Sequence, residues 1–281
     1  MTREEREQKI NARIKEHYKY LENWLVENEH SCKIFGLFLQ GSQNYNLDEY
    51  SDDYMSDIDT KAIVIPSTSD LIHGIEYSRT IVLPNNEHID LKDIRTMFTM
   101  FRKQNTSYLE LLFTDFKIIN KKYTRWWESI YLDRERIARL DPARHALALM
   151  GSAHNKFKAM THVSPHSEDK IEKFGYDPKE LCHLIRYHSE LKRYIDNKGK
   201  SYKEYLLGET KEVDEYLMRV KKGIEYTAEE AIELANKLDK EIKDVTDSFV
   251  ATNPKKDIQI DQLLNDVLEA TVRYNIRLEL K

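Results

Sequence analysis

Two aspartates separated by one residue are the first feature of this sequence that points to chemistry. Asp57 and Asp59 open an apolar run that ends at Ile65 and is followed by Pro66, a pattern that predicts a β-strand. Because side chains alternate across a strand, both carboxylates project from one face. Two adjacent carboxylates repel each other unless a cation lies between them, and oxygen ligands suit Mg²⁺ or Mn²⁺. An isolated Asp-x-Asp pattern is more often a solvent-exposed turn, so its neighbours decide the interpretation.

A glycine-serine pair and a third aspartate supply that context. Gly41 and Ser42 follow the apolar run 33–39 and lie fifteen residues before the carboxylate pair. Glycine lets the backbone approach a phosphate, free N–H groups at a helix start attract anions, and a serine hydroxyl donates a further hydrogen bond. Asp90 lies in a later apolar run. Together these pieces are more specific for a phosphate and metal site than any one alone.

The elements that must position these residues are short strands between 33 and 92, which follow an amphipathic helix at 3–29. The helix has apolar residues at helical spacing, namely Ile10, Ile14, Tyr18, Leu21 and Leu25. Strands are predicted at 33–39, 57–65, 78–83 and 88–91.

From Ile94 onward the apolar period is helical. Helices are predicted at 94–104, 107–113, 122–137, 142–162, 178–197, 201–206, 211–222, 228–249 and 258–279, with a loop at 164–177. We therefore predict an α+β fold. A mixed sheet of four or five strands within 33–92, with flanking helices, carries Asp57, Asp59 and Asp90 on one surface. The expected domains are a sheet-bearing core at 1–117 and a helical C-terminal domain at 118–281.

The composition is that of a globular protein. The chain has 281 residues, of which 40% are apolar and 33% charged, and its net charge is −5. This mild acidity argues against a surface that coats nucleic acid on all sides, but it leaves room for one basic groove. Cys32 and Cys182 are too few for a disulfide framework or a cysteine-rich zinc site. No apolar run is long enough to span a membrane, and the charged N-terminal residues do not resemble a signal peptide. We expect a cytoplasmic protein with no membrane partner.

Four segments of the chain carry a family resemblance. They are Gly41-Ser-Gln-Asn-Tyr-Asn-Leu47, Ser56-Asp-Ile-Asp59, Gln104-Asn-Thr-Ser-Tyr-Leu-Glu-Leu-Leu112 and Gly175-Tyr-Asp-Pro-Lys-Glu-Leu-Cys-His-Leu-Ile-Arg186. With Asp90, they resemble the polymerase-β nucleotidyltransferase superfamily. Within it they resemble most the RlaP family, predicted nucleotidyltransferases of bacteria and phages that are associated with RNA repair. Asn46 replaces a glycine of the family pattern, and Thr106 replaces a proline.

The resemblance implies a nucleotidyltransferase fold and a metal-dependent transfer reaction. A nucleoside monophosphate would pass from an NTP to a hydroxyl acceptor, most simply RNA, with release of pyrophosphate. Gly41 and Ser42 would bind the triphosphate. Asp57, Asp59 and Asp90 would hold two Mg²⁺ ions, with Mn²⁺ as the alternative, and Asp90 would lie nearest the attacking oxygen.

A basic helix face is the remaining candidate nucleotide-binding element. Lys179, His183 and Arg186 fall at i, i+4 and i+7 of the helix predicted from Pro178, so they share one face. This face needs an anion opposite it, which a triphosphate would supply. Taken alone, the trio fits a solvated helix face better than a binding site, and the three aspartates reverse this preference in favour of the nucleotide-binding role.

The sequence leaves several alternatives open. One is a non-catalytic nucleotide- or RNA-binding module of the same fold, and another is a toxin-like enzyme that modifies a protein or a small molecule. The presence of all three aspartates favours an active enzyme. Glu110 is either a further acid near the site or a carboxylate on a helix surface.

Two charged segments remain without an assigned role. Residues 118–160 contain nine Lys or Arg against four acids, which fits an RNA-contacting stripe, the rim of the nucleotide site or a chance excess. In the insertion 48–55, we expect the acids Asp48, Glu49, Asp52 and Asp53 to form a solvated loop. The sequence does not select the acceptor, the NTP or the oligomeric state.

Overall fold

A mixed five-stranded sheet forms within the first half of the chain. The computed structural model describes residues 2–45, 47–48, 56–165, 167–196, 201–207 and 210–280. The strands are β1 (Lys33–Gln40), β2 (Asp59–Ile65), β3 (Ser78–Val82), β4 (His88–Asp93) and β5 (Lys117–Ile119). Their order is β3-β4-β2-β1-β5, with β2 and β4 parallel and the other neighbours antiparallel. The predicted α+β class with a mixed sheet is therefore confirmed.

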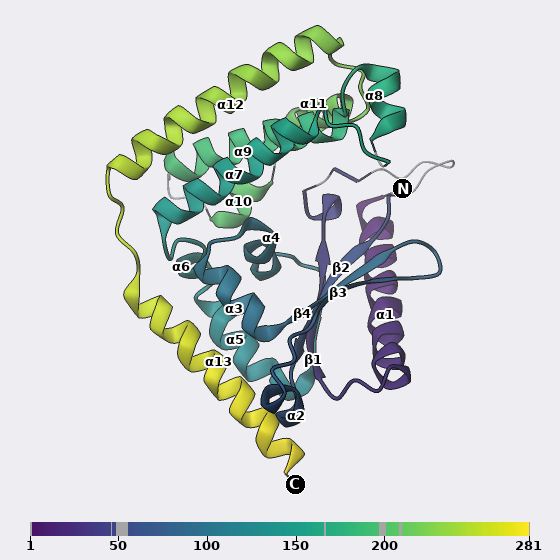
Figure 1. Ribbon diagram of the computed structural model, residues 1–281, viewed down its shortest axis with the longest axis vertical. Coiled ribbons are helices and arrows are strands. Elements are labelled where there is room, and N and C mark those ends of the chain that lie inside the picture. Colours follow the sequence, from purple (N-terminus) through teal and green to yellow (C-terminus); the bar gives the residue numbers. More distant parts are fainter. Residues whose placement is uncertain are drawn as a thin grey trace. The chain divides into compact units, whose positions relative to one another are not determined.

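Helices cover both faces of this sheet (Figure 1). One face carries α1 (Arg3–Glu27), and the other carries α3 (Ile94–Arg102) and α5 (Thr124–Leu132). This double cover is required because β1 and β2 are buried on both faces along most of their length. Shorter helical segments complete this part, namely η1 (Ser42–Tyr45), α2 (Thr68–Ile72), α4 (Thr106–Leu109), η2 (Glu110–Leu112), η3 (Lys121–Tyr123) and α6 (Arg134–Ala138).

The N-terminal helix α1 shows how its sequence determines its packing. Thr2 and Glu5 form a reciprocal capping box that satisfies free N–H groups at the helix start. The buried face consists of Ile10, Ile14, His17, Leu21 and Leu25. Helical spacing predicts Tyr18 on this face, but Tyr18 is only partly buried and His17 is fully buried. A polar side chain at the sheet interface is a departure that the apolar pattern does not predict.

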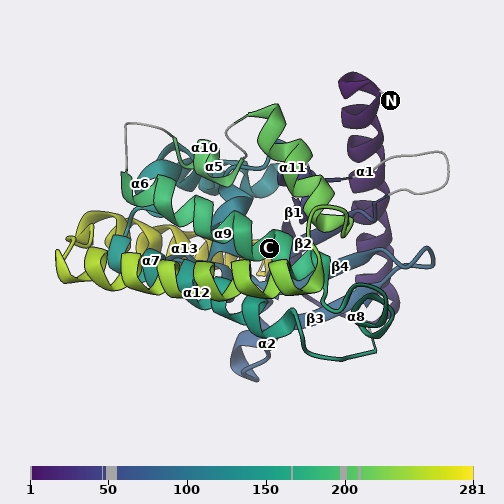
Figure 2. The same ribbon diagram turned by 90° about the horizontal axis from the view of Figure 1, so that it is seen from above.

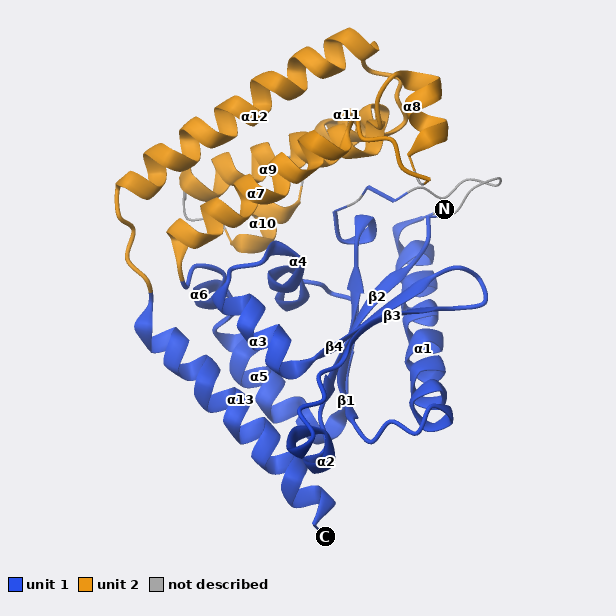
Figure 3. Cartoon of the chain, viewed as in Figure 1, with its two compact units in different colours: residues 1–140, 257–281 blue, residues 141–256 orange. Residues whose placement is uncertain are grey.

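The chain divides into two compact units (Figure 3). Unit 1 comprises residues 1–140 and 257–281, and unit 2 comprises residues 141–256. This division differs from the expected boundary after residue 117. The reason is that β5 joins the sheet beside β1, and that α13 (Ile258–Glu279) packs against α3 and α5.

The regular elements described in unit 2 are all helices. Its helices are α7 (Pro142–Ala159), α8 (Glu168–Phe174), α9 (Pro178–Asp196), α10 (Tyr202–Leu206), α11 (Lys211–Lys221) and α12 (Ala228–Ala251). The long helices α7, α9 and α12 pack against one another, and Figure 2 shows α7 and α12 running side by side. No helix in the described part of the chain is long and apolar enough to cross a membrane.

Three local predictions need correction. The expected loop at 164–177 contains α8, which ends at Gly175 with a φ of 78° in the left-handed region. The strand expected from Asp57 begins at Asp59. The fifth strand, β5, lies outside the expected range of 33–92.

Candidate active site

The pairing of β1 with β2 brings the glycine-serine pair to the Asp-x-Asp segment. Gln40, the last residue of β1, pairs with Asp59, the first residue of β2. Gly41 and Ser42 therefore leave β1 at the end of the sheet where Asp57 leads into β2. Gly41 has a φ of 94°, which glycine adopts without the strain that a side chain would cause. The turn from β1 into η1 thus requires glycine for its backbone conformation.

The turn after Gly41 is tied directly to the segment that carries Asp57. The side-chain amide of Gln43 donates to the backbone carbonyl of Asp57 at 2.5 Å. Arg6 of α1 in turn donates to the backbone carbonyl of Gln43 at 2.8 Å. In the described part of the chain the Ser42 hydroxyl makes no hydrogen bond, so it is available to donate to a ligand.

Asp59 and Asp90 lie on one face of two neighbouring strands. Asp90 of β4 pairs in parallel register with Lys61 of β2, two residues after Asp59. Because Lys61 contacts Asp90, the alternation along β2 places Asp59 on the same face. Asp59 keeps 46% of its side chain exposed, and its Oδ1 accepts from the backbone N–H of His88 at 3.2 Å. Asp57 lies just before the strand and is exposed.

Two lysines hold the carboxylate of Asp90. The Nζ of Lys61 lies 2.7 Å from Oδ2, and the Nζ of Lys92 lies 3.1 Å from Oδ1. Lys61 is 3% exposed, and burial lowers its pKa, although Asp90 partly offsets this effect. Its ammonium lies 4.5 Å from the ring centroid of Tyr108 in α4. The amine of Lys61 is therefore held in place on the face that carries Asp59 and Asp90.

The carboxylates fit a divalent cation to different degrees. Asp57 and Asp59 fit well, since both are accessible and Asp57 forms no side-chain hydrogen bond or ion pair with the described residues. Asp90 fits less well because each of its oxygens already contacts an ammonium group. Among the described residues no three His, Cys, Asp or Glu side chains form a group that could hold a metal ion. The two-ion site with three carboxylates stays a prediction.

A further pair of motif segments meets next to the turn. The Tyr45 hydroxyl donates to the carboxylate of Glu110. The Thr114 hydroxyl donates to the side-chain oxygen of Asn44 at 2.8 Å. Glu110 is 3% exposed, so the interpretation as a surface carboxylate is wrong. The segment Gly41–Leu47 thus rests on the segment that contains Glu110.

The basic trio Lys179, His183 and Arg186 lies on α9 in unit 2, whereas the residues described above belong to unit 1. Lys179 is exposed. Arg186 is 5% exposed and donates to Glu190 at 3.1 Å, so an anion of the chain already faces it. Burial, assisted by nearby cations, lowers the pKa of His183 well below its usual value and keeps the ring neutral. The nucleotide-binding role of this trio stays a prediction.

The basic surplus expected between 118 and 160 is divided between the two units. Several of its cations have acidic partners: Arg136 pairs with Asp257 at 2.9 Å, and Lys156 pairs with Glu180 at 2.9 Å. Three others, in unit 1, are exposed and form no ion pair with the described residues, namely Lys121, Lys122 and Arg125.

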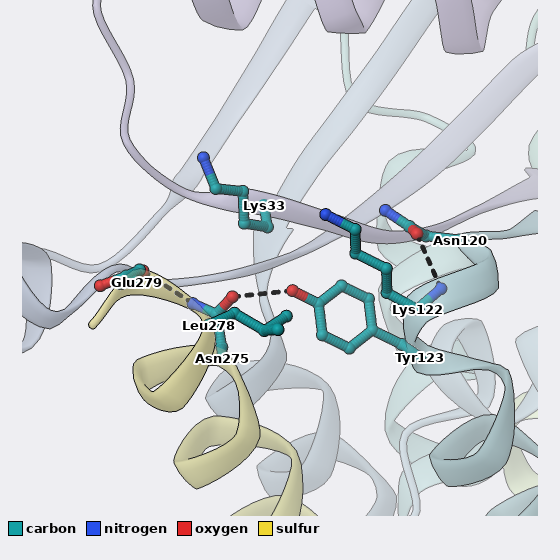
Figure 4. A pocket seen from close by; sticks show the side chains of 7 residues that line it. All are labelled: Lys33, Asn120, Lys122, Tyr123, Asn275, Leu278 and Glu279. Carbon is teal, nitrogen blue, oxygen red and sulfur yellow. Dashed lines mark hydrogen bonds between the residues drawn. The ribbon is translucent and has the colours of Figure 1, made fainter. Parts of the chain in front are cut away.

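A cavity of about 300 Å³ lies in unit 1 near the start of β1 (Figure 4). It is lined by Lys33, Asn120, Lys122, Tyr123, Asn275, Leu278 and Glu279. Its polar groups bond to one another: Tyr123 donates to Asn275 at 2.7 Å, and Asn275 donates to Glu279 at 3.0 Å. The eight residues of β1 separate this cavity from Gly41, so it is not part of the candidate active site.

The acidic insertion is described at one residue only. Asn46 and residues 49–55, which include Glu49, Asp52 and Asp53, lie outside the described residues. Arg6 donates to both carboxylate oxygens of Asp48, at 2.5 and 2.6 Å, and the Asp48 side chain is 3% exposed. The expectation of a solvated Asp48 is therefore wrong.

Sequence reasoning missed several residues of this region. Lys61 had a usable signal, because it continues the alternation of Asp57 and Asp59 and must share their face. Gln43 and Glu87, by contrast, act through contacts with segments distant in the chain. No local pattern indicates such contacts.

Comparison with known proteins does not assign the chain to a family. No protein-family model matches it, and a search of curated proteins finds no match.

Proposed function

We propose that this protein is a metal-dependent nucleotidyltransferase that moves a nucleoside monophosphate from an NTP to a hydroxyl of RNA and releases pyrophosphate. One observation carries the proposal. The pairing of Gln40 with Asp59 joins the glycine-serine turn to the Asp-x-Asp segment, and the neighbouring strand adds Asp90 on the same face as Asp59. A phosphate-binding turn beside exposed carboxylates is what a reaction on a metal-bound triphosphate requires.

The chain's own residues would divide the work as follows. Asp57 and Asp59 would hold a divalent cation, which lowers the pKa of the acceptor hydroxyl and neutralises charge on the triphosphate when it is bound. Gly41 and Ser42 would bind the phosphates, with the Ser42 hydroxyl donating a hydrogen bond. The buried ammonium of Lys61 adds fixed positive charge to the same face. Asp90 would approach the attacking oxygen once Lys92, which is 21% exposed, turns away from it.

The test is transfer of label from each NTP in turn, with Mg²⁺ or Mn²⁺, to total RNA or to protein, followed by gel separation. We expect labelled RNA. The double variant Asp57→Asn with Asp59→Asn should abolish transfer while the thermal melt stays unchanged or rises, because removing two adjacent negative charges relieves repulsion.

A matched control is Asp244→Asn with Asp247→Asn, which makes the same change of charge on exposed residues of α12. This control should retain full transfer. Transfer that survives in the Asp57, Asp59 variant would end the proposal. Label on protein would replace RNA with a protein acceptor.

A second candidate is a module that binds nucleotides without turnover. The observation that favours it is the engagement of both Asp90 oxygens by Lys61 and Lys92. In this case an NTP would bind to the protein in equilibrium dialysis, but no acceptor would become labelled.

A further inference from the structure

A buried carboxylate supports the Asp-x-Asp segment from the opposite side of the sheet. Glu87 lies directly before β4 and is 4% exposed. Its Oε1 accepts from the backbone N–H of Ile58 at 3.2 Å. Ile58 is the residue between Asp57 and Asp59, so Glu87 holds the backbone at the point between the two candidate ligands.

Two side chains of α1 fix Glu87 in turn. The Nε2 of His17 lies 2.8 Å from Oε2 of Glu87, and the Nη2 of Arg13 lies 2.5 Å from the same oxygen. Burial would raise the pKa of Glu87, but hydrogen bonds from Arg13, Asn85 and His17 outweigh it and lower the pKa to about 2. Glu87 is therefore ionised and can only accept hydrogen bonds.

The charge on Glu87 determines the tautomer of His17. Burial lowers the pKa of His17, although Glu87 opposes this effect, so the ring is neutral and has one N–H group. Because a carboxylate only accepts, this N–H is on Nε2, and Nδ1 accepts from the hydroxyl of Thr60 at 3.0 Å. Thr60 directly follows Asp59. The network thus forms hydrogen bonds to the residues on both sides of Asp59, namely Ile58 and Thr60.

We propose that Glu87 is a positioning residue, which sets the spacing and orientation of the Asp57 and Asp59 carboxylates toward a divalent cation. The inference rests on the proposed function. Ile58 and Thr60 are buried, whereas Asp57 is exposed and Asp59 is partly exposed. A ligand pair needs placement within roughly 0.5 Å, which hydrogen bonds to both flanking residues provide.

Docking of α1 alone does not require this network. Ile10, Ile14 and Leu21 are fully or almost fully buried and already attach α1 to the sheet. The attraction within a buried ionic cluster is largely offset by the cost of taking its charges out of water, so such a cluster is weak evidence for a role in stability. Its position under the two aspartates is therefore better explained by the geometry that it imposes on them.

The test measures metal binding without any reaction. The full-length protein is titrated with Mn²⁺, and the free ion is followed by electron paramagnetic resonance. Glu87→Gln keeps the shape and an acceptor for Ile58 but loses the charge that Arg13 and His17 bind. We expect the dissociation constant for Mn²⁺ to rise about 10- to 100-fold, as when the partners of metal ligands are removed. The control is Glu190→Gln, which changes a buried carboxylate of unit 2 and should leave Mn²⁺ affinity unchanged.

A second variant protects the test against loss of folding. Arg13→Met alters a side chain that is 25% exposed, so it should fold and weaken Mn²⁺ binding in the same direction by a smaller factor. Affinities equal to that of the unaltered protein in both variants would overturn the inference and leave the proposed function intact. Absence of Mn²⁺ binding by the unaltered protein would overturn both.

Discussion

Glu87 in unit 1 and Glu190 in unit 2 are both buried carboxylates beside an arginine, yet their pKa values move in opposite directions. For Glu87, hydrogen bonds outweigh burial and the pKa falls to about 2. For Glu190, burial outweighs the attraction of Arg186 and Arg193, and the pKa rises. Both carboxylates are shielded from water, which by itself raises the pKa of each. The two pKa values differ in direction because different hydrogen-bond donors replace the water.

The donors also differ in kind. Glu190 and Arg186 are partners four residues apart on one helix, and both are side chains. Glu87 receives one of its hydrogen bonds from the backbone N–H of Ile58, which remains whatever side chain other than proline stands there. The comparison suggests that an apolar pair can replace the ion pair of unit 2, whereas the carboxylate of unit 1 cannot be replaced in this way.

The largest expected effect tests this difference in unit 2. Arg186→Ala should lower the free energy of unfolding by about 3–5 kcal/mol, because it leaves the buried Glu190 without this cation. The double variant Arg186→Met with Glu190→Leu should recover most of this loss, since apolar residues of similar volume avoid the cost of burying charge. Urea denaturation of each variant measures both values.

The matching pair in unit 1 is His17→Leu with Glu87→Leu. We expect this double variant to stay less stable than the unaltered protein. The reason is that the N–H of Ile58 remains buried without its acceptor, at a cost of about 1–3 kcal/mol. If this double variant were as stable as the unaltered protein, the contrast between the two carboxylates would be invalid.

Acid titration should separate the same two residues. The pKa of Glu87 is about 2 in the folded state against 4.5 for the free group, so its contribution is complete above pH 4.5 and is lost as the pH falls toward 2. This shift corresponds to about 3 kcal/mol. The pKa of Glu190 is raised, so its contribution is complete below pH 4.5 and is lost as the pH rises through its folded value. Glu87→Gln should flatten the loss of stability in acid, and Glu190→Gln should steepen it. The measurement is the urea midpoint of each protein between pH 3 and 6. If the two pKa shifts were incorrect, the midpoints of both variants and of the unaltered protein would change with pH at the same rate.

The smallest effects compare the units in NTP binding. Ser42→Ala should lower kcat/KM about 10- to 150-fold, because a hydrogen bond to a charged phosphate contributes about 1.5–3 kcal/mol. Lys179→Ala should raise KM for the NTP with little change in kcat, and Lys243→Ala on an exposed position of α12 is its control. If Lys179→Ala weakened only acceptor binding, the basic trio of α9 would belong to the acceptor site.

Local patterns predicted much of the fold. The alternation from Asp57 to Ile65 and the helical spacing after Ile94 are properties of single elements, and the corresponding strands and helices are present. Missed elements are short: β5 has three residues, and its pairing with β1 depends on a partner about eighty residues earlier in the chain. The sequence also could not show that α13 returns to unit 1.

In the candidate site, too, patterns within one element were predictable and contacts between distant segments were not. Gly41, Ser42, Asp57, Asp59 and Asp90 could be selected as candidates because each belongs to a recognisable pattern on one strand or turn. The interactions of Asp90 with Lys61 and Lys92, and of Ile58 with Glu87, depend on strand pairing and so were not visible. His17 was missed because a polar residue at a core position breaks the pattern that locates the core.

The return of α13 to unit 1 has a consequence for how the polypeptide folds during synthesis. Residues 141–256 form an insertion into unit 1. The two ends of unit 1 that flank it meet where the N–H of Asp257 donates to the carbonyl of Leu140 at 2.8 Å. Domains generally fold as they emerge from the ribosome, at about 5–20 residues per second. The faces of α3 and α5 that α13 covers therefore stay open to water until the whole helical insertion and α13 have been translated.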